Sequence, residues 1–108
     1  MNEMLGSLQI KIMNHIWEHG PSLVRSILED INKDTPENDK LAYTTVLTVT
    51  RNLVKKGFLS SGRDKGLAHV FSAAVQRDDY LKSVAKHLKE TVFNGTPFKS
   101  TDEYLKYV

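Results

Sequence analysis

The segment "AYTTVLTVTRNLVKKG", residues 42–57, decides the fold of this chain. Its spacing predicts a helix, with Val46, Val49, Leu53 and Lys56 on one side and Gly57 as the left-handed residue that ends it. Threonine is one of the poorer helix formers, yet three threonines stand in its first half. We therefore expect these short hydroxyl side chains to serve a contact at the surface.

The other side of this helix carries residues at the spacing i, i+3, i+4, i+7 and i+11. Together with Thr45 at its edge, we call this set the Thr44–Lys55 stripe: Thr44, Thr45, Leu47, Thr48, Arg51 and Lys55. Hydroxyl groups at a helix N-terminus can bind phosphates or base edges, and apolar groups such as a threonine methyl can contact the thymine methyl. The alternative is an ordinary solvated helix face.

Two further helices are predicted upstream of this segment. Apolar residues recur at helical spacing over 8–19, where Gly20-Pro21 ends the run, and again over 23–32, where Ser22 is the expected N-terminal cap. Residues 33–40, "KDTPENDK", are polar and aperiodic and predict a loop.

Downstream of Gly57 the period changes. Apolar runs at 58–59 and 67–71 surround the turn cluster "SGRDKG", which predicts a β-hairpin with Arg63 and Lys65 at a basic tip. A last helix is expected to begin with Asp78 or Asp79 as its cap and to end at Asn94-Gly95.

The order helix, helix, helix, hairpin is that of a winged helix-turn-helix, a mainly α fold with a small β-hairpin. We expect residues 1–77 to form a DNA-binding winged domain and residues 78–108 to form a dimerisation helix with a short tail. An extra helix beside a complete winged domain usually faces a second protomer. The apolar stripe expected to join two protomers is Leu81, Val84, Leu88 and Val92.

Charge is unevenly distributed along the 108 residues, although the net charge is only +2. Residues 41–77 carry six basic side chains against one acidic side chain, whereas residues 18–40 are net acidic. A basic middle segment is a modest signal for a polyanionic partner. It favours double-stranded DNA over the main alternative, a winged helix that only binds protein.

Composition excludes several other classes. The chain has no cysteine, which excludes disulfides and thiolate metal sites. It has no signal peptide and no apolar run near the ~20 residues of a membrane span, so we expect a soluble cytoplasmic protein without membrane contact.

No constellation of side chains supplies a nucleophile or an acid–base pair, so we expect neither an enzyme nor a cofactor nor a small-molecule substrate. His15 and His19 have the i, i+4 spacing of a metal-binding pair. Since no third ligand is evident, we interpret them as surface or boundary residues and expect no metal site.

Three motifs resemble the penicillinase-repressor family of bacterial transcription regulators: "IMNHIWEHGP" in the first helix, "YTTVLTVTRNLVKKGFL" through the third, and "FNG" at the end of the fourth. The resemblance covers residues 5–95. It implies a homodimeric repressor that binds an inverted-repeat operator, with the third helix in the major groove and C-terminal helices joining the protomers. Since the tail after Gly95 is short for this family, we expect a weak dimer.

Overall fold

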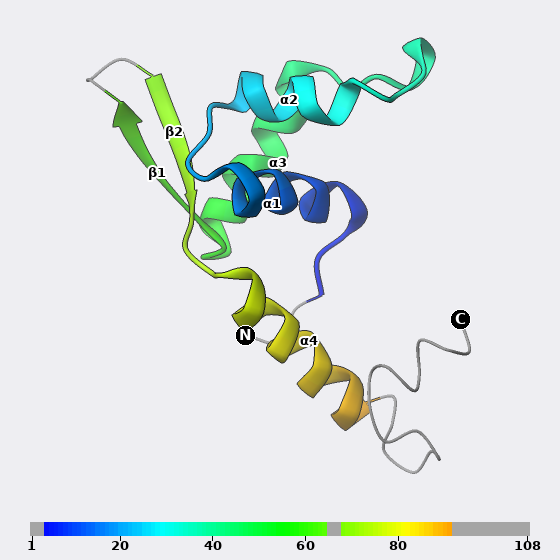
Figure 1. The fold of residues 1–108 in the computed structure, drawn as a ribbon, viewed down its shortest axis with the longest axis vertical. Coiled ribbons are helices and arrows are strands. Elements are labelled where there is room, and N and C mark those ends of the chain that lie inside the picture. The colour runs from blue at the N-terminus through cyan, green and yellow to red at the C-terminus, as the bar shows by residue number, and fades with distance from the viewer. Residues whose placement is uncertain (1–3, 65–67, 92–108) are drawn as a thin grey trace. The chain divides into compact units, whose positions relative to one another are not determined.

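The computed structural model describes residues 4–64 and 68–91, without the side chains of residues 63, 64, 68 and 91. The chain divides into two units, Leu5–Gln76 and a second unit that contains the last helix. The elements are α1 (Ser7–His19), α2 (Val24–Asn32), a 3₁₀ turn η1 (Glu37–Asp39), α3 (Tyr43–Lys55), β1 (Leu59–Asp64), β2 (Ala68–Ala73) and α4 (Arg77–Thr91). The predicted winged helix-turn-helix order is confirmed (Figure 1).

Helix α3 lies at the centre of the first unit, where it packs on α1, α2 and β1. Its inner side buries Val46, Thr50 and Leu53. Thr50 is not predicted to be buried, but its hydroxyl donates a 2.7 Å hydrogen bond to the Val46 carbonyl, which satisfies the group away from water. The expectation that Lys56 shares this inner side is wrong, because Lys56 is exposed.

The remaining core comes from the elements around α3. It consists of Ile12, Met13 and Ile16 of α1, Val24 and Ile27 of α2, and Phe58, Leu59 and Phe71 of the hairpin region. Each full burial of such a side chain stabilises the fold by roughly 1.5–3 kcal/mol.

Gly57 ends α3 as predicted. Its φ is +85°, and the N–H groups of Gly57 and Phe58 donate to the carbonyls of Val54 and Leu53. This pair of bonds is a Schellman motif, which satisfies the last helical carbonyls. After this motif the chain enters β1 within two residues. The position of Gly57 therefore fixes both the end of α3 and the start of the hairpin.

Ser22 does not cap α2, contrary to the sequence prediction. The N-cap position is Leu23, and the Ser22 hydroxyl donates instead to the Gly20 carbonyl at 2.8 Å. The backbone of Ser22 forms an antiparallel bridge with Phe71, with N–O distances of 3.0 and 2.9 Å. The connection between α1 and α2 therefore extends the sheet by one bridge.

Strands β1 and β2 pair antiparallel, from Leu59 opposite Ala73 to Asp64 opposite Ala68. The Trp17 indole N–H donates a 2.9 Å hydrogen bond to the carbonyl of Val75, just after β2. This bond joins α1 to the segment after β2, and the Ser22–Phe71 bridge joins β2 to the connection between α1 and α2.

Helix α4 is described by itself. It begins at Arg77, so Asp78 and Asp79 lie in its first turn, where their negative charges interact favourably with the helix dipole. The prediction that one of them is the N-cap is therefore wrong. Leu81 is 55 % exposed and Val84 and Leu88 are half-buried. Val92 lies outside the described residues. Within residues 4–64 and 68–91, no helix is long and apolar enough to cross a membrane.

Candidate nucleic-acid interface

The Thr44–Lys55 stripe lies on the outer side of α3. Thr44, Thr45, Thr48, Arg51 and Lys55 are exposed, and Leu47 is half-buried. Two residues absent from the sequence prediction extend this surface: Tyr43, which is 44 % exposed, and Asn52. The helix therefore presents hydroxyl, apolar, amide and guanidinium groups on one side, which are the groups that contact base edges and phosphates.

Thr48 has part of its hydrogen-bonding capacity already in use. Its hydroxyl donates a 2.8 Å bond to the carbonyl of Thr44, one helical turn earlier. The oxygen lone pairs and the methyl group remain on the exposed side. Thr48 can therefore accept a hydrogen bond from adenine or cytosine amino groups, or contact a thymine methyl, without giving up its intrahelical bond.

The N-terminus of α3 is open to an anion. Ala42 at the N-cap provides no side-chain hydrogen bond, and the first turn contains no acidic residue. The first N–H groups of a helix lack intrahelical partners and carry the positive end of the helix dipole. A phosphate can therefore approach this end beside the hydroxyl groups of Thr44 and Thr45.

A hollow of about 360 Å³ is lined by residues of α2, α3 and β2. Its basic rim includes Arg25 of α2, Arg51 of α3 and His69 of β2. Sequence reasoning misses Arg25, because it belongs to a net acidic segment. The only sequence signal for it is its place in the first turn of the helix that precedes α3.

The wing itself is described only in part. Arg63 pairs with His69 through the backbone, but its side chain is not described, and Lys65 lies outside the described residues. Their contact with phosphates stays a prediction. The pairing places the backbone of Arg63 near the end of the hairpin remote from Leu59 and Ala73.

Position of α3 depends on the loop before it. The Asn32 side chain, at the end of α2, forms hydrogen bonds with both backbone groups of Leu41. This closes the loop that contains η1, two residues before α3 begins. Sequence reasoning treats this loop as polar and aperiodic and does not find the bond.

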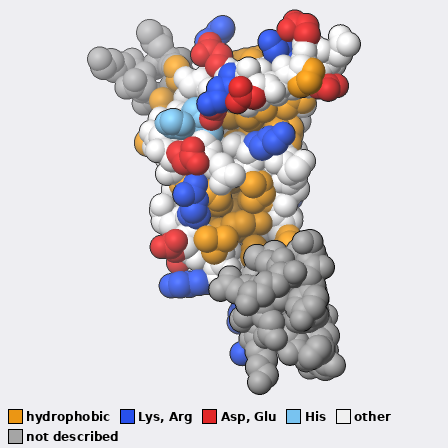
Figure 2. All heavy atoms as spheres, turned by 45° about the vertical axis from the view of Figure 1, so that its right-hand side comes forward, with side chains coloured by type: hydrophobic (Ala, Val, Ile, Leu, Met, Phe, Trp, Pro, Cys, Tyr) orange, Lys and Arg blue, Asp and Glu red, His pale blue; other side chains and the backbone are white. Residues whose placement is uncertain are grey.

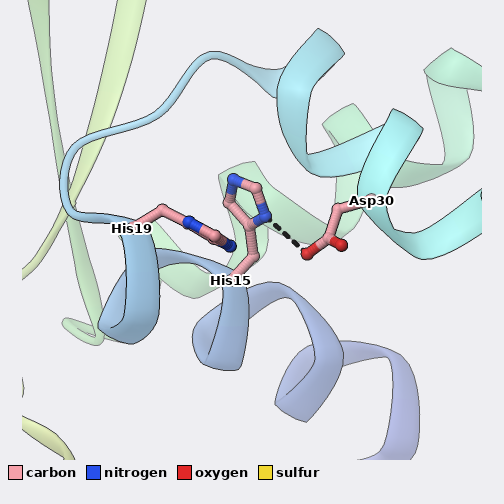
Figure 3. Close-up of side chains that lie close together, drawn as sticks. All are labelled: His15, His19 and Asp30. Atoms are coloured by element: carbon pink, nitrogen blue, oxygen red, sulfur yellow. Dashed lines mark hydrogen bonds and ion pairs between the residues drawn. The ribbon is translucent and has the colours of Figure 1, made fainter.

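The prediction that His15 and His19 are surface or boundary residues is confirmed for His19, which is exposed, and is wrong for His15, which is buried. His15 is only 8 % exposed, and its Nδ1 lies 2.7 Å from Oδ2 of Asp30 on α2. His19 is exposed, and its ring centroid lies 4.6 Å from that of His15 (Figure 3). The fold thus adds a carboxylate to the histidine pair, which the separation of 15 residues along the chain conceals.

The carboxylate of Asp30 is also held by Lys33, whose Nζ lies 3.0 Å from Oδ1. Hydrogen bonds from His15 and then from Lys33 lower the pKa of Asp30 below its usual value. The hydrogen bond between Lys33 and Asp30 in turn raises the pKa of Lys33. Asp30 is therefore a carboxylate at neutral pH.

Comparison with known proteins identifies the family of this chain. Residues 5–104 match the penicillinase repressor family. The chain belongs to this family. It is a family of transcriptional repressors and not of enzymes, as the sequence analysis expects.

The BlaI transcriptional regulators of two Mycobacterium tuberculosis strains, CDC 1551 / Oshkosh and H37Rv, are each 36% identical to this chain over 78 residues. The match covers 71% of this chain and 53% of each regulator, so the chain spans about half the length of the curated relatives it matches.

Two solved structures share the fold of this penicillinase repressor family member. One is the solution structure of Bacillus licheniformis BlaI, in its monomeric form in complex with the blaP half-operator: TM-score 0.59, 20% identity, 74% of this chain and 92% of that chain covered. The other is the transcriptional regulator Tm0710 of Thermotoga maritima: TM-score 0.55, 16% identity, 94% and 67% covered.

Proposed function

We propose that this chain is a transcriptional repressor that binds an inverted-repeat operator as a homodimer, with α3 in the major groove. The observation that carries the proposal is the outer side of α3. Its inner residues are buried in the core, while the Thr44–Lys55 stripe faces outward with its two basic side chains. A protein-binding winged helix has no need for this combination.

Phosphate contacts are expected on both sides of the stripe. Arg25 and His69 line the hollow with Arg51, and the open N-terminus of α3 adds backbone donors. On the far side of the hollow we assign Arg63 and Lys65 of the wing to the neighbouring phosphates. In this arrangement phosphate contacts orient the domain, and the threonines with Leu47 read the bases.

Membership of the penicillinase repressor family supports this assignment. The Bacillus licheniformis BlaI structure, which shares the fold, is a complex with a half-operator. We infer that this chain reads one half-site per protomer in the same way. Two half-sites then lie about one helical turn or a multiple apart, because only that spacing presents them to a two-fold symmetric dimer.

The dimer surface is assigned to α4. Leu81, Val84 and Leu88 recur at helical spacing, and Val92 continues the series in the sequence. Leu81 is among the exposed large hydrophobic residues. Val84 and Leu88 are half-buried, so all three described side chains leave apolar surface that a second protomer can cover.

The experiment that tests the proposal is fluorescence anisotropy with a DNA fragment from upstream of the chain's own gene. A scrambled fragment of equal length serves as the control DNA. We expect the native fragment to bind at least about 10³-fold more tightly. An Arg51→Ala, Lys55→Ala variant is expected to lose this binding, whereas Lys11→Ala, which removes an exposed charge from α1, is expected to retain it. Equal affinity for both fragments would favour the protein-binding alternative.

A further inference from the structure

We propose that His15, His19 and Asp30 form a binding site for a first-row transition-metal cation of the Zn²⁺ type, which links α1 to α2. This site lies outside the DNA-binding surface proposed above and does not depend on it. One ligand atom from each of the three residues lies within 4.8 Å of the others. Figure 3 shows the two imidazole rings from α1 and the carboxylate from α2 turned toward one another.

The donor set selects the cation. Imidazole nitrogen suits Zn²⁺, Cu²⁺, Ni²⁺ and Fe²⁺, and two histidines with one carboxylate leave an open position for water or another ligand. Mg²⁺ and Ca²⁺ prefer sites built from oxygen atoms. The site is therefore expected to bind Zn²⁺ and not to bind Mg²⁺.

The geometry needs only a small adjustment. Zinc ligands bind at about 2.0–2.2 Å in a tetrahedral arrangement, so two ligands of one ion lie roughly 3.4 Å apart. The 2.7 Å contact between His15 Nδ1 and Asp30 Oδ2 therefore lengthens slightly when an ion binds. His19 is exposed, and a rotation of its ring closes the remaining distance. Figure 2 shows histidine side chains at the surface near acidic and basic side chains.

The bond between His15 and Asp30 prepares two of the ligands. A carboxylate only accepts hydrogen bonds, so His15 Nδ1 donates to Asp30 Oδ2 at 2.7 Å. When an ion takes the place of that proton, the proton moves to Nε2 of His15, and Nδ1 offers its lone pair to the metal. The metal-bound imidazole is neutral, and the charge of Asp30 remains to balance the cation.

Lys33 competes with the cation only in part. Its Nζ contacts Oδ1 of Asp30, whereas Oδ2 faces the histidines. Lys33 is also 65% exposed, and exposed ion pairs contribute little. Asp30 keeps its negative charge at neutral pH, because His15 and Lys33 both lower its pKa.

An ion held by both helices binds the folded unit in preference to the unfolded chain. It therefore raises the melting temperature in proportion to the logarithm of its concentration above Kd. The helices α1 and α2 support α3, but none of the three ligands belongs to the Thr44–Lys55 stripe. We expect Zn²⁺ to stabilise the winged unit and leave its outer α3 surface free.

The test is isothermal titration of the full chain with Zn²⁺, together with thermal unfolding in Zn²⁺ and in Mg²⁺. We expect one Zn²⁺ per chain, a higher melting temperature with Zn²⁺ and no change with Mg²⁺. Replacing Zn²⁺ by Co²⁺ is expected to give visible absorption bands typical of low coordination number. These measurements need no DNA, so their failure is distinct from a failure of the proposed repressor function.

His19→Gln is the decisive variant, because His19 is exposed and its loss leaves the core intact. We expect it to weaken Zn²⁺ binding at least about tenfold, and Asp30→Asn to do the same, whereas His69→Gln, another exposed histidine, binds as the wild type does. Equal affinity in His19→Gln and the wild type would overturn the site. One Zn²⁺ per two chains would overturn it as well, since it would indicate a bridge between protomers.

Discussion

Asn32 and Leu41 are joined by two hydrogen bonds of 2.9 Å, one from Nδ2 of the Asn32 side chain to the Leu41 carbonyl and one from the Leu41 N–H to Oδ1 of the Asn32 side chain. Both bonds are partly buried. The Asn32 side chain thus satisfies both backbone groups of Leu41, as a neighbouring strand would, and closes the loop between α2 and α3. Because α3 begins at Tyr43, this pair fixes the chain two residues before that helix starts.

Asn32→Ala removes both bonds and leaves the two Leu41 backbone groups without a protein partner. We expect unfolding to become easier by about 1–3 kcal/mol, and operator affinity to fall because the entry into α3 loosens. Denaturant unfolding and anisotropy measure the two effects. Asn38→Ala, an exposed asparagine in the same loop, is the matched control and is expected to change neither. An unchanged stability in Asn32→Ala would mean that water replaces the side chain without loss.

Thr48 offers a test of base reading, because its two functional parts can be removed separately. Thr48→Val keeps a methyl group and removes the hydroxyl, while Thr48→Ser keeps the hydroxyl and removes the methyl. Whichever group contacts a base, its loss is expected to cost about 1–3 kcal/mol at one position of the operator, and folding is expected to change little since Thr48 is exposed. Binding to a set of single-base operator variants measures this. An equal loss on operator and random DNA would show that Thr48 only positions the helix.

Local patterns predict much of this fold. The helical period of α3 and the position of Gly57 follow from the sequence, because both depend on neighbouring residues and on the φ that only glycine adopts easily. The change of period after Gly57 predicts the hairpin for the same reason. These features give the order of elements and hence the winged-helix fold.

Features that depend on distant residues are not predicted. Ser22 has the chemistry of a helix cap, but its backbone pairs with Phe71 across the sheet, and that partner decides its role. Asp30 reaches His15 only after α1 and α2 pack together, so the sequence shows two histidines and conceals their third partner. The assignment of the Thr44–Lys55 stripe to DNA stays a prediction for binding experiments.

The pKa of Asp30 leads to a prediction about acid stability. His15 and Lys33 donate to this carboxylate, His19 lies close to it, and its pKa is lower in the folded state than in the unfolded chain. The folded state thus binds a proton less readily. The stabilisation is present above the unfolded-state pKa and is lost as the pH falls through the lower folded-state value.

Asp30→Asn is therefore expected to lower the free energy of unfolding near neutral pH and to flatten its decline in acid. Urea unfolding at a series of pH values measures both. Asp39→Asn changes an exposed carboxylate in η1 and is expected to follow the wild-type curve. A parallel decline in the wild type and Asp30→Asn would assign the acid sensitivity to other groups.

Salt dependence tests the phosphate contacts. Each neutralised phosphate contributes a slope of about −0.9 to the logarithm of affinity against the logarithm of salt concentration. We expect Arg63→Ala with Lys65→Ala to weaken binding to all sequences alike and to flatten this slope. Arg25→Ala is expected to flatten it too, since Arg25 lines the hollow beside α3. Lys11→Ala serves as the charge control. An unchanged slope in the double variant would show that the wing does not contact phosphates.

Assembly through α4 is tested by Leu88→Asp. Leu88 stands on the same side of α4 as Leu81 and Val84, so a charge there faces the apolar surface assigned to the partner protomer. The free energy needed to bury an unpaired carboxylate exceeds the free energy that association through a few apolar side chains provides. The protomers are therefore expected to dissociate. We expect sedimentation velocity to show a monomer and anisotropy to show loss of operator binding, because a single protomer reaches one half-site only.

Circular dichroism is expected to show the winged unit still folded, since Leu88 belongs to the other unit of the chain. Lys89→Asp changes the neighbouring exposed residue by a larger charge and is expected to leave the dimer intact. A dimer that persists in Leu88→Asp would assign the protomer contact to another surface.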